Sequence, residues 1–492
     1  MVDRLKSSSG KLPKYKVEFI EALIESGALK LNGDYQLKSK REAPYFINVG
    51  ALNSGKSTEA LANAYADAIA KHLKGKFTHI YGIPEKGVSL APTTVTALWK
   101  RHKINVNWFF GRKGGEKQYG EATNLSKDDL SKIFVGSVPD EKSKILVIDD
   151  VLTTGGTKET ALAMLAKILP NRETVSVVIA VDRQEVGING KGAVEEFEEK
   201  TGTKVTSILK TADIVQYMNE KAKEEYAEPK RRVSAYLRVY GTAEAREFVA
   251  KTVPLVAVMK SEKSLIPACD TRDLNVFEEL VKQTSGVEGI GGYKIGFMLA
   301  LTHSLPKVVE IARKYTDKPL IYDHQKAATD IPDTAKEFMA INRDAGINSV
   351  ILFPHTGPET ERAWIYRAID NGLGVIVGGI MTHPGYLVSE GGFMLDEGAL
   401  RIYKIAAQAG VTDFVVPGTK PEMIKMADEV IRAEGVYPKF FPPGFGSQGS
   451  DVTEVKLVLG KSWHPIVGRS ILQAKNGDYG RAAEENVAQL LR

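Results

Sequence analysis

The segment Ile145–Thr157 reads ILVIDDVLTTGGT, and its pattern decides the fold of the N-terminal half of the chain. Four apolar residues are typical of a buried strand, and two acids, Asp149 and Asp150, follow them directly. Hydroxyl residues and glycines come next, before a helix that we expect to begin at Lys158. Backbone N–H groups at such a helix N-terminus form a cradle for a phosphate, and neighbouring carboxylates accept hydrogen bonds from vicinal hydroxyls. A ribose 5-phosphate has both groups, so the segment indicates a site for such a molecule.

A second phosphate-loop pattern lies upstream, at Gly50–Ser57 (GALNSGKS). It has the spacing of a nucleotide-binding P-loop, follows a strand-like run and precedes a helical stretch. The strand that ends in Asp149 could then supply the acid that holds Mg²⁺ in an NTPase. However, an NTPase needs only a Mg²⁺ ligand on this strand, and its mechanism would not require the additional phosphate loop at Thr153–Thr157. We therefore favour the ribose 5-phosphate site and keep a P-loop NTPase as the alternative for this half.

Ile145–Thr157 resembles the phosphoribosyl-pyrophosphate signature of the type I phosphoribosyltransferases. Around it, Phe19–Gly241 is similar to one member of that family, orotate phosphoribosyltransferase. The resemblance implies a Rossmann-like parallel sheet with a hood, and Mg²⁺ held mainly by pyrophosphate and ribose oxygens. It implies catalytic roles for Lys113 and Lys117. The substrate-binding residues that it implies are Lys38, Tyr45, Phe46, Lys86, Arg112, Asp149, Asp150, Thr153, Thr154, Gly155, Gly156, Thr157 and Arg183.

The basic residues of this set are scattered in the sequence, and we expect them to converge on the departing pyrophosphate. Arg183 is expected to hold the orotate carboxylate through two hydrogen bonds. The family carries a histidine in its mobile basic loop, where this chain has Tyr119. The resemblance therefore does not extend to proton transfer at that position.

The C-terminal half repeats a strand–helix unit. Short apolar runs recur eight times between Leu265 and Val467, with helical stretches such as Pro421–Glu434 between them. Eight such units in about 250 residues predict a (β/α)₈ TIM barrel, and a doubly wound open sheet is the alternative. We place the boundary between the two α/β domains at Gly241–Thr242, so that the domains are residues 1–241 and 242–492.

Charges of alternating sign follow one of these apolar runs, in Ile321–Thr334 (IYDHQKAATDIPDT). Asp323, Lys326 and Asp330 have the i, i+3, i+7 spacing of exposed ion pairs on a helix. Against a surface helix, the run before Asp323 is typical of a buried strand, and a barrel carries its reactive groups at the carboxyl ends of strands. We therefore expect these charges to belong to a site.

Together with Asp270 and Lys294, these residues resemble orotidine 5′-monophosphate decarboxylase, across Leu265–Leu491. The family's Lys-Asp-Lys-Asp set falls on Lys294, Asp323, Lys326 and Asp330, with two extra residues that must bulge. The resemblance implies decarboxylation without metal or organic cofactor. Loss of CO₂ leaves negative charge on a ring carbon, for which we expect Lys326 to be the ammonium and proton donor. The substrate-binding residues implied are Asp270, Thr334, Thr382, Pro384, Gln448, Gly468 and Arg469.

Four histidines, each near a predicted strand end, support a rival interpretation of this half as a metal-dependent barrel hydrolase. They are His324, His355, His383 and His464. No His-x-His pair marks the first strand, and we expect these side chains to be structural. A non-catalytic nucleotide-sensing module that kept both folds is a further alternative.

Composition excludes several other classes. The 492 residues are 43% hydrophobic and 26% charged, as in globular proteins. A net charge of +5 suits anionic small substrates as well as nucleic acid and does not choose between them. The single Cys269 excludes an internal disulfide, and no apolar run has the length of a signal peptide or membrane span.

We therefore expect a cytoplasmic enzyme that makes UMP in two steps and binds small molecules, with neither nucleic acid nor membrane as partner. The resemblance implies a homodimer or higher homo-oligomer in both families. In each, a loop of one subunit completes the site of the other, here Arg112–Glu121 and Asp330–Thr334.

Overall fold

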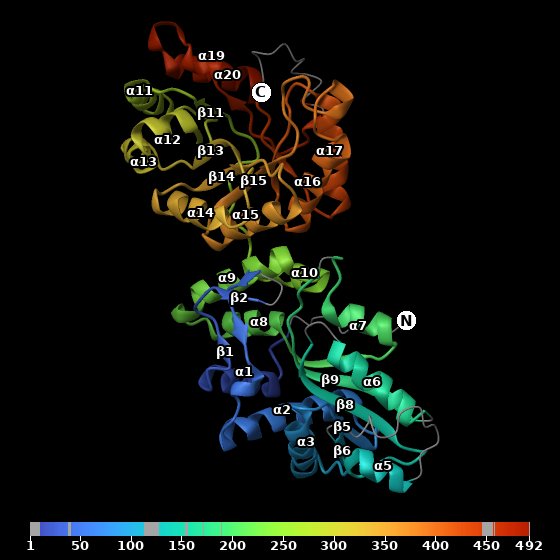
Figure 1. Cartoon of the computed structure of the whole chain (residues 1–492). Helices are drawn as coiled ribbons and strands as arrows, with labels where there is room; N and C mark the ends of the chain where they lie inside the picture. Colours follow the sequence, from blue (N-terminus) through green and yellow to red (C-terminus); the bar gives the residue numbers. More distant parts are fainter. Residues whose placement is uncertain are drawn as a thin grey trace. The chain divides into compact units, whose positions relative to one another are not determined.

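The computed structural model divides the chain into two compact units, Met1–Val253 and Pro254–Arg492, coloured from blue to green and from green to red in Figure 1. Helix α10 (Ala243–Thr252) follows the domain boundary expected at Gly241 and packs against α8 and α9 of the first unit. The structure describes residues 10–37, 41–112, 127–152, 156–170, 172–187, 189–444, 456 and 458–491, without the side chains of residues 127, 128, 157 and 326.

The first unit is built on a sheet whose described strands lie in the order β10-β9-β8-β5-β6-β7. β7 pairs antiparallel with β6, and the other neighbouring strands are parallel. The strands are β5 (His79–Gly82), β6 (Asn107–Gly111), β7 (Phe134–Gly136), β8 (Lys144–Val151), β9 (Glu173–Asp182) and β10 (Val205–Lys210).

Helices cover both faces of this sheet. α2 (Gly55–Leu73) and α3 (Gly87–His102) pack on one face. On the other face, α5 (Lys127–Ile133), α6 (Gly156–Ile168) and α7 (Ala193–Thr201) bury their apolar side chains against Phe109, Val147, Val177 and their neighbours. Strands buried on both faces need apolar residues at successive positions rather than at alternate ones. The unbroken apolar runs of β8 and β9 meet this requirement.

A smaller layer of short strands and helices completes the first unit. β1 (Leu29–Lys30) pairs antiparallel with β4 (Phe46–Ile47), and β2 (Tyr35–Gln36) with β3 (Glu42–Ala43). α1 (Lys14–Glu25), α8 (Thr211–Lys221) and α9 (Ala227–Tyr240) belong to the same layer. Aromatic residues hold it together: the rings of Tyr45 and Tyr236 lie 5.9 Å apart, and the Arg41 guanidinium lies over the ring of Tyr240.

The second unit is a barrel of parallel strands in the order β17-β16-β15-β14-β13-β12-β11-β18. Parallel bridges from Phe440 to Trp463 and from Pro443 to Ile466 join the two ends of this order and close the ring. The strands are β11 (Ile266–Cys269), β12 (Tyr293–Gly296), β13 (Leu320–Ala327), β14 (Ser349–Leu352), β15 (Gly374–Gly378), β16 (Asp413–Val415), β17 (Lys439–Phe440) and β18 (Ile466–Val467).

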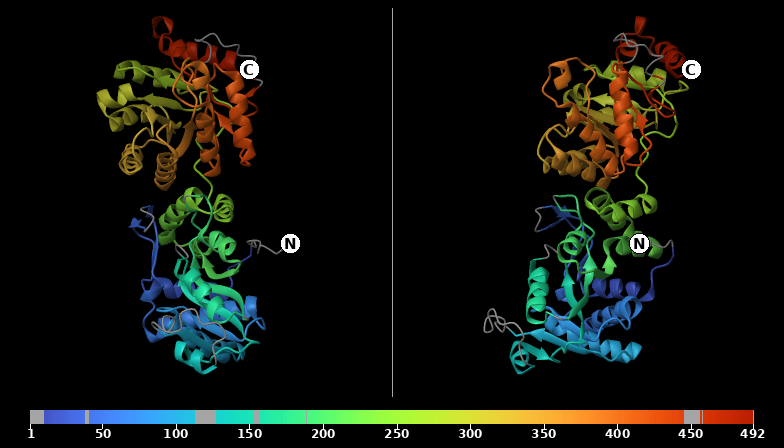
Figure 2. Two further views of the ribbon diagram at one scale, coloured as in Figure 1. Left: turned by 45° about the vertical axis from the view of Figure 1, so that its right-hand side comes forward. Right: turned by 90° about the vertical axis from the view of Figure 1, so that its right-hand side faces the viewer.

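Helices lie outside these strands, as both views of Figure 2 show. They are α11 (Leu274–Thr284), α12 (Phe297–His303), α13 (Leu305–Arg313), α14 (Thr334–Asp344), α15 (Pro358–Asp370), α16 (Asp396–Gln408), α17 (Pro421–Ala433), α19 (Arg469–Leu472) and α20 (Tyr479–Leu491). Inward side chains such as Ile321, Ile376 and Phe441 fill the barrel. The predicted fold class is confirmed in both halves, and the doubly wound alternative for the second is wrong, because its strands follow one another around a closed ring.

Two other sequence interpretations fail on the structure. The surface helix for Ile321–Thr334 is wrong, because β13 extends through Ala327. The P-loop pattern of Gly50–Ser57 follows β4, which lies outside the six-stranded sheet. Its Lys56 pairs with Glu25, and the amide of Ser57 donates to Ser54 Oγ at 3.2 Å. Gly50–Ser57 therefore forms a capped helix start after a short strand outside the main sheet, not the loop after a central strand that a P-loop requires.

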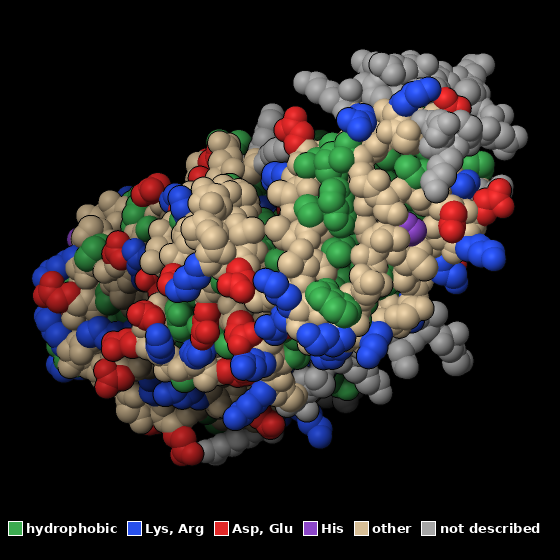
Figure 3. All heavy atoms as spheres, turned by 90° about the horizontal axis from the view of Figure 1, so that it is seen from below, with side chains coloured by type: hydrophobic (Ala, Val, Ile, Leu, Met, Phe, Trp, Pro, Cys, Tyr) green, Lys and Arg blue, Asp and Glu red, His purple; other side chains and the backbone are tan. Residues whose placement is uncertain are grey.

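None of the helices in the described part of the chain has the length and hydropathy of a membrane span. Basic and acidic side chains are interspersed over most of the face shown in Figure 3.

Phe109 offers a test of the packing in the first unit. Its ring is fully buried and lies 5.0 Å from Tyr81 and 5.2 Å from Phe134. Phe109→Ala is expected to lower the free energy of unfolding of this unit by about 3–5 kcal/mol, because it removes buried contacts and leaves a cavity. Urea unfolding measures the loss. Trp99→Ala, at a half-exposed residue of α3, is the control and should change little; equal losses in the two variants would contradict the packing.

Candidate active sites

Two buried acids mark the site of the first unit. Asp149 and Asp150 lie near the carboxyl end of β8, between β5 and β9, and each is 6% exposed. Lys158 Nζ lies 2.6 Å from Asp149 Oδ2, and Lys86 Nζ donates to Asp150 Oδ2. Burial raises the pKa of Asp149, and the attraction of Lys158 opposes this effect. Each acid thus has its own ammonium partner.

Lys86 reaches Asp150 because the loop after β5 is tightly folded. A side chain on Gly82 would place its Cβ 2.0 Å from the carbonyl oxygen of Gly87, so the close approach of these two glycines requires that both lack a Cβ. The amide of Gly87 donates to the carbonyl of Ile83 across the same turn, at 2.7 Å. The Lys86 side chain remains 57% exposed and is accessible to a substrate.

Lys158 was not singled out in the sequence as a site residue, although it is the partner of Asp149. In the sequence it follows Thr157 as an ordinary charged residue at a helix start. Its burial depends on how α6 packs against β8, which no local pattern specifies. Gly156 begins α6, and none of the described residues lies within 4 Å of the position that a Cβ there would take.

A second group of residues lies at the carboxyl end of β9. Arg183 donates to Glu185 Oε1 through Nε at 2.9 Å and Nη2 at 2.6 Å. Its guanidinium carbon lies 5.1 Å from the ring centroid of Tyr45, whose hydroxyl donates to the same Glu185 oxygen at 2.9 Å. Burial and Glu185 raise the pKa of Tyr45. Thr211 donates to the carbonyl of Arg183 and fixes the segment.

This arrangement changes two expectations from the sequence. Arg183 already binds a carboxylate within the chain, so an orotate carboxylate would share or displace Glu185. Tyr45 is fully buried, and its ring packs against the guanidinium of Arg183. Phe46, in contrast, is 37% exposed and packs near Tyr35. The pairing of Glu185 with Arg183 is a feature that the structure adds.

Several predicted residues of this site lie outside the described part of the chain. They are Lys38, Lys113, Lys117, Tyr119, Thr153, Thr154 and Gly155. Thr157 lies in α6, without a described side chain. Arg112 follows β6, where its amide donates to the carbonyl of Ile133 at 2.8 Å and its side chain is exposed.

A buried ammonium between two acids marks the site of the second unit. Lys294 of β12 is 4% exposed, and its Nζ donates to Asp270 Oδ1 at 3.0 Å and to Asp323 Oδ2 at 3.1 Å. Burial lowers the pKa of Lys294, but the attraction of Asp323 and Asp270 outweighs it, and the pKa is raised. A Cβ on Gly296 would lie 2.2 Å from Asp270 Oδ1, so this glycine makes room for the contact.

The bulge expected near Asp323 lies within β13. This strand pairs with β14 at Tyr322 and again at Ala327, and its register shifts between these two residues. The amide of Gln325, a residue with φ of 54°, donates to Asp323 Oδ1 at 2.8 Å. Lys326 lies in the bulged part of the strand, and its side chain is not described.

Gln325 was overlooked in the sequence. Its Oε1 is buried and has no hydrogen-bond partner among the described residues. The same oxygen lies 3.8 Å from the position that a Cβ on Gly296 would take, beside Asp270. Only the bulge brings this amide to the site, so the sequence carried no signal for it.

The other predicted residues of the second unit lie at the carboxyl ends of several strands. Asp330 is exposed, and its carbonyl accepts hydrogen bonds from Thr356 and Thr360. Thr334 begins α14. Thr382 and Pro384 follow β15, Gly468 and Arg469 follow β18, and Gln448 lies outside the described residues.

The four histidines do not come together. His324 hydrogen-bonds with the hydroxyl of Tyr322 at 2.6 Å, His355 with that of Tyr386 at 3.0 Å and His464 with that of Ser264 at 2.7 Å. His383 is exposed, near the ring of Tyr386. No group of three or more His, Cys, Asp or Glu in the described ranges could hold a metal ion.

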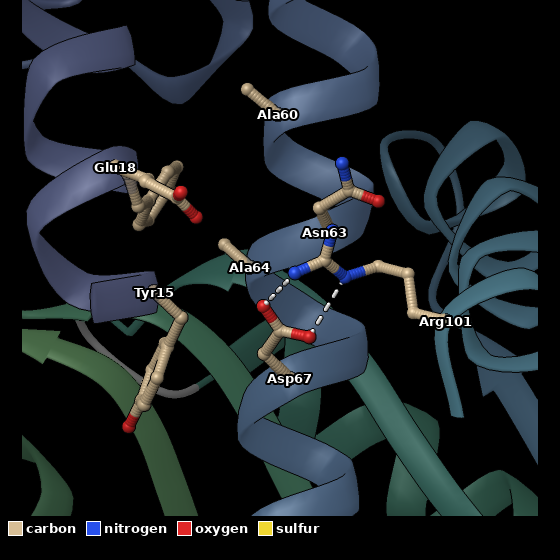
Figure 4. A pocket seen from close by; sticks show the side chains of 8 residues that line it. Tyr15, Glu18, Ala60, Asn63, Ala64, Asp67 and Arg101 are labelled. Carbon is tan, nitrogen blue, oxygen red and sulfur yellow. Dashed lines mark hydrogen bonds and ion pairs between the residues drawn. The ribbon is translucent and has the colours of Figure 1, made fainter. Parts of the chain in front are cut away.

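A separate pocket of about 220 Å³ lies between α1, α2 and α3 (Figure 4). Figure 4 shows Arg101 directed at Asp67, with which it forms two hydrogen bonds of 2.9 and 2.7 Å. Glu18 at its rim pairs with Lys14. Because the charged groups that line it already have partners, we assign no substrate to this pocket.

Comparison with known proteins identifies the two halves. A family model described as "Phosphoribosyl transferase domain" matches residues 48–211. The chain is 34% identical, over 236 residues, to an orotate phosphoribosyltransferase of Dichelobacter nodosus (strain VCS1703A); the match covers 48% of this chain and 99% of that protein. The chain belongs to the orotate phosphoribosyltransferase family. Another such relative, from Vibrio parahaemolyticus, is 35% identical over 46% of this chain and 98% of its own length.

Residues 263–485 match the model described as "Orotidine 5'-phosphate decarboxylase / HUMPS family". Among solved structures, the orotate phosphoribosyltransferase of Francisella tularensis covers 46% of this chain and 99% of its own (28% identity, TM-score 0.38). The orotidine 5'-monophosphate decarboxylase of Methanocaldococcus jannaschii, complexed with an inhibitor, covers 47% and 99% (24% identity, TM-score 0.41). The two family models, together with the orotate phosphoribosyltransferase relatives, confirm both family resemblances seen in the sequence.

His464 offers a test of the buried polar groups in the barrel. Burial, together with Lys439, lowers the pKa of this histidine from 6.5 to about 4. The folded state therefore disfavours protonation, and stability that is fully present above pH 6.5 is lost as the pH falls towards 4. The loss amounts to about 3 kcal/mol. His464→Gln should flatten the dependence of the unfolding free energy on pH in this window, measured by urea unfolding.

Asp413 has the opposite effect on stability, because burial raises its pKa to about 6. The comparison of variant and parent at each pH cancels this contribution. His383→Gln, at an exposed residue, is the control. Parallel pH profiles for parent and His464→Gln would contradict the burial of a neutral imidazole.

Proposed function

We propose that the chain is a bifunctional enzyme that catalyses the last two steps of UMP synthesis. The first unit joins orotate to 5-phosphoribosyl 1-diphosphate, forming orotidine 5′-monophosphate and diphosphate. The second unit removes CO₂ from orotidine 5′-monophosphate and forms UMP. The observation that carries the proposal is the presence, in one chain, of two family-matched units that each have a buried acid paired with a buried lysine at the carboxyl ends of parallel strands.

In the first reaction, Asp149 and Asp150 accept hydrogen bonds from the ribose hydroxyls. The N-terminus of α6, at Gly156, binds the 5-phosphate together with Thr153–Thr157. Lys86 transfers from Asp150 to the pyrophosphate, aided by Lys38, Arg112, Lys113 and Lys117. Arg183, which the buried ring of Tyr45 supports, orients orotate beside the partly exposed Phe46.

Mg²⁺ fits this site as a complex with the substrate. Both buried acids already face an ammonium group, so they offer hydroxyl-accepting oxygens rather than an open set of metal ligands. The ion would be held by pyrophosphate and ribose oxygens beside Asp149 and Asp150, where it supplies positive charge for the leaving group.

In the second reaction, the bond between the pyrimidine ring and its carboxylate breaks and CO₂ departs. The electron pair left on the ring carbon takes a proton from Lys326, and no metal or organic cofactor takes part. Asp323 lies near the substrate carboxylate, and Lys294 holds Asp270 and Asp323 in place. Thr382 and Pro384 contact the pyrimidine, while Gln448, Gly468 and Arg469 bind the phosphate, whose distant contacts position the ring.

We propose that the chain works as a homodimer in the cytoplasm, with domains at residues 1–241 and 242–492. Large apolar side chains are exposed at the carboxyl end of the barrel: Ile331 is 58%, Leu395 66% and Phe393 fully exposed. Ile331 directly follows the exposed Asp330 in the chain, and the exposure of these apolar side chains supports an interface in which Asp330–Thr334 reaches the partner's site. Arg112–Glu121 would do the same in the first unit.

The decisive experiment is incubation of the purified chain with orotate, 5-phosphoribosyl 1-diphosphate and Mg²⁺. We expect orotidine 5′-monophosphate to appear and then to be converted to UMP, both resolved by liquid chromatography. ATP hydrolysis is measured in the same preparation. Hydrolysis that depends on Lys56, without UMP, would favour the NTPase.

Lys326→Ala tests the assignment of the proton donor. Decarboxylation of added orotidine 5′-monophosphate should become undetectable, because the ammonium that stabilises the developing carbanion is gone. Orotidine 5′-monophosphate formation should continue at the parent rate and the product should accumulate. Lys307→Ala, at an exposed residue of α13, is the control and should retain both reactions. Loss of both reactions in Lys326→Ala would contradict two separate sites.

A further inference from the structure

We propose that Lys158 is a positioning residue of the phosphoribosyltransferase reaction, which holds Asp149 charged and aimed at the ribose hydroxyls. This role deepens the function proposed above and rests on it.

The first argument is the geometry of the pair. Lys158 Nζ lies 2.6 Å from Asp149 Oδ2, and the two side chains are 8% and 9% exposed. Such a contact is charge-assisted and shielded from water, so it restricts both side chains strongly. The backbone N–H of Asp150 also hydrogen-bonds to the Asp149 carboxylate, so the carboxylate is held from two sides.

The second argument is the place of Lys158 in the chain. Gly156, Thr157 and Lys158 form the first turn of α6. The same turn presents the amides that bind the 5-phosphate in the proposed function. The ion pair therefore ties the phosphate-binding end of the site to the diol-binding acid on β8. It holds these two groups at a constant separation, as the two ends of one ribose 5-phosphate require.

The third argument is the balance of charge around Asp149. Burial and the neighbouring carboxylate of Asp150 raise its pKa, whereas Lys158 lowers it. From α2, the Tyr65 hydroxyl donates to the carbonyl oxygen of Asp149 and not to its carboxylate. Lys86 pairs with Asp150. Among the residues that the structure describes, Lys158 is thus the ammonium in contact with the Asp149 carboxylate, and its removal favours the protonated acid.

The two lysines differ in a way that gives Lys158 its separate role. Lys86 is 57% exposed and comes from a loop, so it can leave Asp150 when pyrophosphate binds. Lys158 is buried and comes from a helix, so it stays. While Lys86 contacts the substrate, Lys158 remains as the fixed counter-ion of the acid pair.

Lys158→Met in the full chain tests this role, since methionine has a similar length and no charge. The initial rate of orotidine 5′-monophosphate formation is measured at saturating orotate and Mg²⁺, with varied 5-phosphoribosyl 1-diphosphate, from pH 5.5 to 9. We expect KM for this substrate to rise at least about tenfold at pH 7, and kcat to stay within about threefold. The acid limb of kcat/KM should move up by at least about one pH unit, because Asp149 then titrates at higher pH.

Lys167→Met is the matched control, because Lys167 is an exposed residue of the same helix. It should leave both KM and the pH profile of the parent unchanged. The thermal unfolding of every variant is recorded, to separate a loss of fold from a loss of function.

A second variant covers the case in which Lys158→Met does not fold. Asp149→Asn combined with Lys158→Met leaves a neutral pair that needs no counter-ion. If Lys158 acts through the charge of Asp149, the double variant should have the KM of Asp149→Asn alone, within about twofold. Independent, additive losses would overturn the role.

The outcomes also separate this role from the proposed function. An active parent with an unchanged KM and pH profile in Lys158→Met overturns the role of Lys158 alone. A parent that forms no orotidine 5′-monophosphate overturns the proposed function and this role with it.

Discussion

The requirement that a buried carboxylate keep a cation beside it governs both units of this chain. An isolated charge in a protein interior is costly, and removing one partner of a buried pair leaves the other uncompensated. Asp149 and Asp150 meet the requirement with one lysine each, whereas the buried Asp323 shares Lys294 with the partly exposed Asp270. These pairs fix which loops and helices must approach the strand ends, and hence the shape of both sites.

The parallel sheet explains why these charges collect where they do. Strands covered on both faces must be apolar along their length, so polar side chains are confined to their ends. In the first unit, β8 runs from Lys144 to Val151, and its two acids lie near its carboxyl end. In the barrel, Asp270 follows β11 directly, and Asp323 precedes the bulge of β13. The same geometry thus produces a reactive edge in two unrelated arrangements of strands.

Much of this could be predicted from the sequence, because it depends on local patterns. The apolar runs gave the strands, the acids after them gave the reactive edges, and the eight-fold recurrence gave the barrel. What could not be predicted depends on contacts between distant segments. Lys158 became a site residue only through the packing of α6 on β8. Arg183 was expected to face a substrate, and its pairing with Glu185, two residues further on, could not be read from the sequence.

The burial of Tyr45 was missed for a similar reason. Its neighbour Phe46 has the same hydrophobic character, and nothing in the sequence distinguishes the two. In the structure the ring of Tyr236, from α9, covers Tyr45, whereas Phe46 stays partly exposed on β4. The long separation between Tyr45 and Tyr236 puts this contact beyond any window of periodicity.

The bulge of β13 has a consequence for the way in which such barrels diverge. In a regular strand, Asp323 and Lys326 would point to opposite sides, because side chains alternate with a period of two. A bulge suspends that alternation locally, and the pairing with β14 resumes at Ala327. The fold therefore tolerates insertions at this point. As a result, the number of residues between Asp323 and Lys326 can change during evolution. Ancestry in this kind of barrel is better traced by the strand to which a charge belongs than by the spacing between charges.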